Sequence, residues 1–110
     1  MDVASNAVFA AVSNPLRRRM LDLLRGRDRP AGELVAAFPA LPQPSVSRHL
    51  RVLREAGLVE VTRRAQQRIY SLHARRLRDL DAWLARYREF WPERLDLLGA
   101  HLDRRRRAAE

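Results

Sequence analysis

Apolar residues along the chain follow two spacings, one typical of helices and one typical of strands. Small apolar residues over 4–12 predict a short, closely packed helix. A second helix is predicted to begin at Asn14, an N-cap residue, with Pro15 in the first helical position, and to end near Gly26. The segment AGELVAAF (31–38) predicts a third, short helix. The first third of the chain is therefore expected to be helical.

A proline-rich turn separates the third helix from a fourth. Three prolines lie within 39–44, where they prevent a continuous helix. A new helix is predicted to begin near Pro44 and to end at Gly57. Apolar residues at i, i+4 and i+7 of this helix are expected to face the core: Val46, Leu50 and Leu53. Its opposite face is polar and basic.

The spacing changes to alternation beyond the fourth helix. The segments LVEVTRR and QRIYSL predict two short strands joined near Ala65 and Gln66. We expect the strands to pair through inward-facing residues: Val59, Val61, Tyr70 and Leu72. The predicted product is a hairpin whose tip carries arginine and glutamine.

Helical spacing returns from about residue 75 and continues to about 103. Pro92 lies inside this segment and predicts a kink or a break. Residues 104–110, with four arginines, are expected to form a disordered basic tail. The apolar stripe of the terminal helix comprises Leu77, Leu80, Leu84, Tyr87, Trp91, Leu95, Leu98 and Leu102, joined by Trp83 and Phe90.

Positive charge is concentrated in two parts of the chain. The 110 residues fit one domain, expected over 1–103, and include 22 arginines, no lysine and a net charge of +9. A GC-rich genome explains the absence of lysine but not the surplus of positive charge. Six arginines against two acids give 43–72 a charge of +4, and 104–110 carries +3, whereas 73–103 is neutral. This surplus on a folded domain indicates nucleic acid or an anionic membrane surface as partner.

Several classes of protein are excluded because the residue types or motifs that they require are absent from the sequence. Without cysteine there are no disulfides, thiolate metal sites or cysteine nucleophiles. No apolar run reaches the length of a membrane span, and the N-terminus lacks the basic region of a signal peptide, so we expect a cytoplasmic protein without membrane contact. No acid/base pair, nucleophile system or phosphate loop is present. The sequence therefore predicts neither an enzyme nor a cofactor.

The order of elements predicts a mainly α fold with a small β-hairpin, arranged as a winged helix-turn-helix. The reading motif is expected over about 31–72; its second helix enters the major groove, and the hairpin, or wing, touches the DNA backbone or minor groove. Arg48 is the candidate for two-point contact with guanine. The predicted DNA-binding residues are Gln43, Ser45, Ser47, Arg48, His49 and Arg51 on the helix and Arg63, Arg64, Gln66, Gln67 and Arg68 on the wing. The alternative for both sets is an ordinary solvated surface.

The stretches NPLRRRMLDLL, GELVAAF, QPSVSRHLRVLREAGLVEV and RIYSL resemble the ArsR-type (ArsR/SmtB) bacterial transcriptional repressors. The resemblance covers roughly residues 8–72, and WLARYREFW is similar to a metal-free branch of that family. Two positions depart from the family pattern. Ala65 stands where glycine is usual, so the hairpin is expected to be wider than a two-residue turn, and Pro42 replaces the usual N-cap serine. The arginines over 17–19 either touch phosphates, as the family implies, or form a solvated helix face.

The resemblance implies that the terminal helix dimerises together with the N-terminal helix. The aromatic stripe agrees, because an apolar surface of that size needs a partner. The predicted interface residues are Val8, Phe9, Leu80, Trp83, Leu84, Tyr87, Trp91, Leu95 and Leu98. The alternative is that the helix folds back onto its own domain. A two-fold dimer would recognise an imperfect palindrome.

Signal sensing is the least defined part of the prediction. Many ArsR-type proteins release DNA on binding a metal, but here the reading motif has no cysteine and the terminal helix has no paired histidines or His-x-x-Glu at ligand spacing. We therefore expect no metal site, and no small-molecule inducer is identified. The candidate carboxylates and histidine are Asp79, Asp81, Glu89, Glu93 and His101.

The sequence favours a homodimeric, sequence-specific DNA-binding regulator that represses transcription by occupying a palindromic promoter site. Two alternatives from other classes stay open. One is a protein-interaction module, which would depend on the aromatic helix rather than on Arg48. The other is a non-specific nucleic-acid binder, which would show a steep salt dependence and no footprint.

Overall fold

The computed structural model describes residues 2–92, and the chain divides after Leu80 into two compact units. The first unit holds the predicted reading motif; the second begins at Asp81. The predicted extent of one domain to residue 103 lies partly outside the described residues and stays a prediction. The elements are α1 (Val3–Val12), α2 (Pro15–Gly26), β1 (Arg29–Pro30), α3 (Ala31–Ala36), α4 (Gln43–Glu55), β2 (Val59–Arg64), β3 (Gln67–Leu72), the 3-10 turn η1 (Ala74–Leu77), α5 (Arg78–Ala85) and the 3-10 turn η2 (Arg88–Phe90).

Helix α2 begins where the sequence predicts it. The Asn14 side-chain oxygen accepts hydrogen bonds from the backbone N–H groups of Leu16 (2.8 Å) and Arg17 (3.3 Å). These bonds satisfy N–H groups that have no partner inside the helix, and Pro15, at the first position, has no N–H to satisfy. The predicted N-cap is therefore confirmed.

The reading helix α4 has an uncapped start and a glycine-terminated end. Its N-cap is Pro42, which makes no side-chain hydrogen bond, so the departure from the usual serine has a structural consequence. At the other end Gly57 has φ +79°, and its N–H and that of Leu58 bond back to the carbonyls of Arg54 (3.0 Å) and Leu53 (2.9 Å). This backbone conformation favours glycine, and the predicted stop is confirmed.

The sheet has three antiparallel strands in the order β1-β3-β2. Val59 lies opposite Leu72 and Val61 opposite Tyr70, as predicted. Arg64 lies opposite Gln67, which leaves only two residues in the turn, so the expectation of a wider hairpin is wrong. The turn is accommodated because Ala65 adopts φ +56°.

Strand β1 is a feature that the sequence pattern missed. Arg29 and Pro30, between the predicted second and third helices, pair with Tyr70 and Ile69. A two-residue strand is too short to show any alternation, so only its partner strand reveals it. Pro30 is tolerated because β1 lies at the sheet edge.

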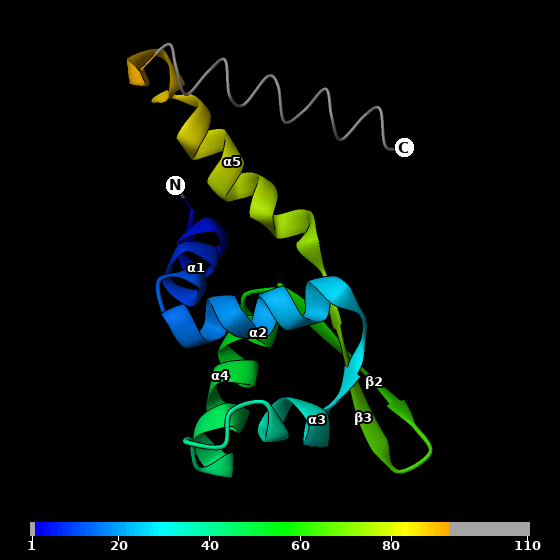
Figure 1. Ribbon diagram of the computed structural model, residues 1–110. Helices are drawn as coiled ribbons and strands as arrows, with labels where there is room; N and C mark the ends of the chain where they lie inside the picture. The colour runs from blue at the N-terminus through cyan, green and yellow to red at the C-terminus, as the bar shows by residue number, and fades with distance from the viewer. Residues whose placement is uncertain (1, 93–110) are drawn as a thin grey trace, which may run out of the picture. The chain divides into compact units, whose positions relative to one another are not determined.

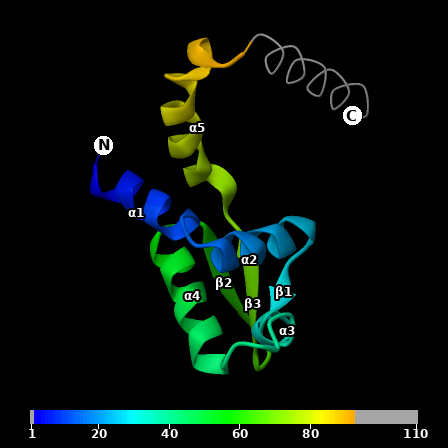
Figure 2. The ribbon, with the colours of Figure 1, turned by 60° about the vertical axis from the view of Figure 1, so that its left-hand side comes forward.

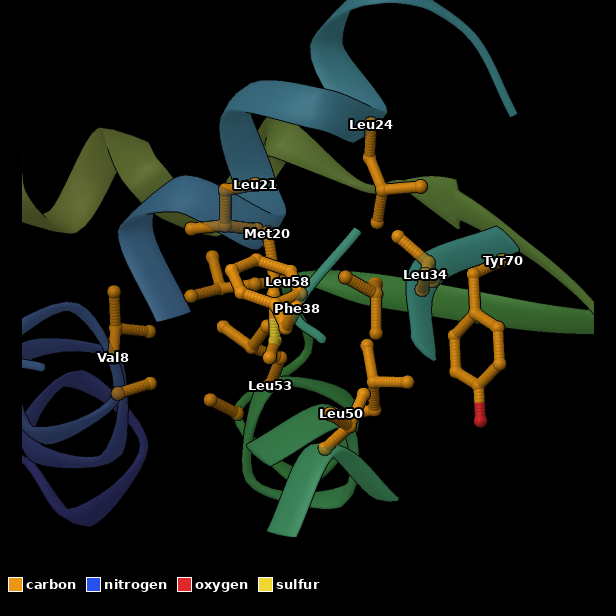
Figure 3. Close-up of a cluster of buried hydrophobic side chains, with 14 residues drawn as sticks. Val8, Met20, Leu21, Leu24, Leu34, Phe38, Leu50, Leu53, Leu58 and Tyr70 are labelled. Carbon is orange, nitrogen blue, oxygen red and sulfur yellow. The ribbon is translucent and has the colours of Figure 1, made fainter. Parts of the chain in front are cut away.

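The core of the first unit is built from α1, α2, α3, α4 and the sheet (Figure 3). Met20, Leu34 and Leu53 are fully buried in it. The three core positions predicted on α4 are all buried and thus confirmed: Val46, Leu50 and Leu53. Val8 also has no exposed surface, because α1 packs on α2 and α4 in the same protomer. Its assignment to a dimer interface is therefore wrong.

As far as Pro92, the terminal segment is not one continuous helix. Instead of running from about 75 to Pro92, it starts as η1, is α-helical only over Arg78–Ala85, and resumes as η2. Helices in proteins are held mainly by packing of their apolar face, and the apolar side chains from Leu84 to Trp91 are exposed in one protomer. Trp91 is extended, as expected for a residue before proline. Within residues 2–92, no helix is long and apolar enough to cross a membrane.

Candidate DNA-binding surface

Three segments gather at one end of the first unit. Both ribbon views place the N-terminal turn of α4, helix α3 and the tip of the β2–β3 hairpin at the end opposite α1 (Figures 1 and 2). Helix α3, the turn 37–42 and α4 form a helix-turn-helix, and the hairpin is the wing. The structure thus brings the start of the reading helix and the tip of the wing to the same end of the unit.

The predicted residues of α4 mostly point to solvent. Ser45 and His49 are half-buried, whereas the other four are exposed: Gln43, Ser47, Arg48 and Arg51. Arg48 lies in the N-terminal half of the helix, the part that reaches base edges when such a helix enters the major groove. The exposed face holds hydrogen-bonding and cationic groups, with the helix's first acid, Glu55, in its last turn.

A hollow of about 400 Å³ joins the reading helix to the wing. Gln43 and Ser47 of α4 and Arg68 of β3 line it, together with Gly32 and Val35 of α3. Three predicted DNA-binding residues from two elements therefore share one concave surface.

The wing tip concentrates like charge. Arg63 lies directly opposite Arg68, and residues opposite each other in an antiparallel pair share a face of the sheet. Two cations in that position repel each other and lower stability, and an anion bound between them would relieve the repulsion. All five predicted wing residues are exposed, namely Arg63, Arg64, Gln66, Gln67 and Arg68.

Comparisons with known proteins agree with this geometry. The chain matches the model of a family described as a helix-turn-helix domain over residues 12–62. The transcriptional repressor SdpR of Bacillus subtilis (strain 168) is 39% identical over 82 residues, which cover 74% of this chain and 90% of SdpR. A crystal structure of an ArsR family transcriptional regulator matches with a TM-score of 0.72 and 26% identity, covering 80% of this chain and 90% of that one. The chain belongs to the ArsR family.

A second solved structure, described as a possible transcriptional regulator for arsenical resistance, matches this ArsR chain with a TM-score of 0.63 and 36% identity, over 84% of this chain and 92% of that one. Members of the ArsR family are DNA-binding transcriptional regulators and not enzymes. The predicted family, fold class and DNA-binding activity are thereby confirmed.

The arginine run of α2 makes contacts inside the protomer in this ArsR chain. Arg17 is half-buried and bonded inside the protomer, with its Nη1 3.1 Å from the Nδ1 atom of His49. Arg18 donates to the carbonyl of Val12 at 2.7 Å. The guanidinium of Arg19 lies over the ring of Phe38, 5.1 Å from its centre, a cation–π contact.

Exposed apolar side chains of the second unit coincide with the predicted ArsR dimer interface. Leu84, Tyr87 and Trp91 are exposed, and the Trp83 and Tyr87 rings lie 5.1 Å apart between centres. Phe9, Leu80 and Trp83 are half-buried, whereas Leu95 and Leu98 lie outside the described residues. Val3 and Phe90 are also strongly exposed apolar residues, and neither belongs to the predicted interface.

Candidate metal ligands are not assembled within the part of the chain that the structure describes. Over residues 2–92, no group of three or more His, Cys, Asp or Glu side chains is placed to hold a metal ion. Asp79 instead accepts a hydrogen bond from the Ser5 hydroxyl at 3.1 Å, which ties α5 to α1. Glu93 and His101 lie outside the described residues.

Proposed function

We propose that this ArsR protein is a homodimeric repressor that occupies a palindromic promoter site. The observation that carries the proposal is that the start of α4 and the tip of the wing lie at one end of the first unit (Figures 1 and 2), while the polar side chains of α4 and the arginines of the wing are largely exposed. The segment 43–72, which contains both, has a charge of +4. A cationic surface with a helix and a wing on the same side fits a DNA duplex of opposite charge.

In this proposal the two elements have different tasks. Helix α4 enters the major groove, where Arg48 donates two hydrogen bonds to one guanine and Gln43 and Ser47 contact neighbouring groups. At the start of α4, Pro42 and Pro44 have no N–H and the Ser45 N–H donates to the Pro42 carbonyl at 3.0 Å. The Gln43 N–H therefore lies at the positive end of the helix dipole, which favours a nearby phosphate. The wing arginines contact phosphates, so they raise affinity for all sequences alike.

The dimer in this proposal covers the exposed side chains of the terminal segment. Leu84, Tyr87 and Trp91 form an apolar surface that gains free energy when a second copy removes it from water. The neutral charge of 73–103 suits contact between two identical segments, because neither repels the other. Two-fold symmetry then places two reading helices about one DNA turn apart.

The deciding experiment is a protection footprint of the full chain on the DNA upstream of its own gene and its neighbours. We expect a protected region with two inverted half-sites about 10 base pairs apart between centres. Mobility shifts at two salt concentrations, with a scrambled duplex of the same composition, separate specific from non-specific binding. Equal affinity for both duplexes and no protection would contradict the proposal.

A further inference from the structure

One arginine links the N-terminal helix to the reading helix through hydrogen bonds. Arg17 of α2 donates from Nε to the carbonyl of Ala11 at 2.8 Å and from Nη2 to the carbonyl of Ala10 at 3.2 Å. Its third nitrogen, Nη1, lies 3.1 Å from Nδ1 of His49, 32 residues away in sequence. Each of the three guanidinium nitrogens therefore makes a contact inside the protomer.

The contact with Arg17 determines which ring nitrogen of His49 carries the hydrogen. A guanidinium group has donors only, so the bond requires a lone pair on the Nδ1 atom of His49. A neutral imidazole with a free Nδ1 lone pair carries its hydrogen on Nε2. His49 therefore carries its hydrogen-bond donor on Nε2.

The charges around the ring keep it neutral. Burial lowers the pKa of His49 below its usual 6.5, and the positive charges of Arg17 on α2 and Arg48 on α4 lower it further. Protonation would put an Nδ1–H donor against the donors of Arg17 and break the bond. At neutral pH the ring therefore stays in the form that Arg17 binds.

We propose that Arg17 is a positioning residue for DNA recognition, which holds the ring of His49 so that its Nε2–H group donates to a DNA acceptor. The inference rests on the proposed function, since it assigns His49 a contact in that complex. The acceptor is an oxygen or nitrogen of the DNA, either a phosphate or a base edge. Loss of base preference on substitution of His49 indicates a base edge, and equal weakening on all sequences indicates a phosphate.

Arg18 provides a matched control within the same helix. Its guanidinium also donates to a carbonyl at the C-terminal end of α1, that of Val12, but no contact with His49 is recorded for it in the described part of the chain. Arg18→Ala therefore removes a comparable tie between α2 and α1 and leaves the His49 ring in place. A role of Arg17 that is only structural predicts similar effects for both variants.

A double-mutant cycle on the footprinted site tests the proposal. Dissociation constants are measured for the wild type, Arg17→Ala, His49→Ala, the double variant and Arg18→Ala, with folding checked by circular dichroism. We expect each of the first two single variants to bind about three- to tenfold more weakly, as for loss of one hydrogen bond. The double variant should bind as His49→Ala does, and Arg18→Ala should stay within about twofold of wild type. Losses that multiply in the double variant overturn the proposal.

Nitrogen NMR of His49 in the free protein gives a readout that does not depend on DNA. In the wild type at pH 7.5 we expect an unprotonated Nδ1 and a protonated Nε2, with a pKa below 6.5. Arg17→Ala should raise this pKa, because it removes a nearby positive charge, and Arg18→Ala should not. A protonated Nδ1 in the wild type overturns the proposal even if Arg17→Ala fails to fold.

The two proposals fail in different ways. If no DNA is bound specifically, the proposed function fails and takes the role of Arg17 in DNA recognition with it, whatever the NMR result. If an operator is found and the cycle is multiplicative, only the role of Arg17 fails.

Discussion

Single residues carry local strain and specificity in this protein. Ala65 occupies the first position of a two-residue hairpin turn with φ +56°. For an L-residue with a Cβ atom this left-handed region costs about 1–2 kcal/mol, whereas glycine enters it freely. The turn therefore keeps its two-residue length at the expense of stability.

Replacing Ala65 by glycine should stabilise the protein. We expect Ala65→Gly to raise the free energy of unfolding by about 1 kcal/mol, because relief of the strained φ outweighs the added freedom of the unfolded chain. Urea denaturation measures the change. Ala37→Gly is the control: Ala37 is exposed with φ −71°, so glycine there should lower stability by about 0.5–1 kcal/mol. Stabilisation by both variants, or by neither, would contradict this account of the turn.

Arg48 is the residue expected to carry base preference. Arg48→Ala should reduce discrimination at one or two base pairs of the operator by about 1–3 kcal/mol, because a two-point contact with guanine is lost. Competition binding with operators substituted one base pair at a time measures it. Arg54→Ala removes an equal charge from the last turn of the same helix and should leave base preference unchanged. A uniform loss across all operators for Arg48→Ala would assign it to the backbone.

At the scale of elements, the wing combines pairing that the sequence predicts with a charge arrangement that the register reveals. Alternation placed Val59, Val61, Tyr70 and Leu72 on the inner face, and the structure confirms it. The same register sets Arg63 opposite Arg68 at the tip. Repulsion between these two cations lowers the stability of the hairpin. The presence of the pair is therefore better explained by binding of a polyanion.

Wing substitutions should change affinity and stability in opposite directions. Arg63→Ala is expected to weaken binding to all sequences alike and to reduce the slope of log affinity against log salt by about 0.9, since one phosphate contact is lost. The same variant should unfold at a slightly higher urea concentration, because the repulsion from Arg68 is gone. Arg64→Ala, opposite the neutral Gln67, should weaken binding without this gain. A change of base preference in either variant would show that the wing reads sequence.

At the scale of the whole molecule, one protomer leaves apolar surface that it does not cover. Tyr87 is 45% and Trp91 40% exposed, which is high for aromatic side chains. The helical spacing continues through this segment while the helix itself ends at Ala85. The sequence thus predicts a helix where the protomer leaves the apolar side chains exposed. In the proposed dimer, packing of a second copy against these side chains would stabilise such a helix.

Substitution of these aromatic residues should separate the protomers. The double variant Tyr87→Ser/Trp91→Ser is expected to weaken the dimer by about 2 kcal/mol or more, because central aromatic residues dominate the energy of such interfaces. Sedimentation velocity over a concentration series measures it, and circular dichroism checks that the first unit stays folded. Ala40→Ser, an exposed change in the turn before α4, should leave the association unchanged. A wild type that sediments as a monomer would remove the dimer from the proposed function.

The sequence by itself determined the helices and the hairpin of the first unit and which of their faces are buried. Asn14, Pro15 and Gly57 act through their own backbone and nearest neighbours, and apolar spacing needs only the period of a helix or strand, so both can be read locally. The tertiary structure decided the pairing of β1 with β3, the burial of Val8 and the bond from Arg17 to His49. These depend on which surfaces meet after folding, because a donor finds its acceptor through packing of segments far apart in the chain. The family and its DNA-binding activity were therefore predictable from residue types, whereas the internal role of Arg17 required the fold.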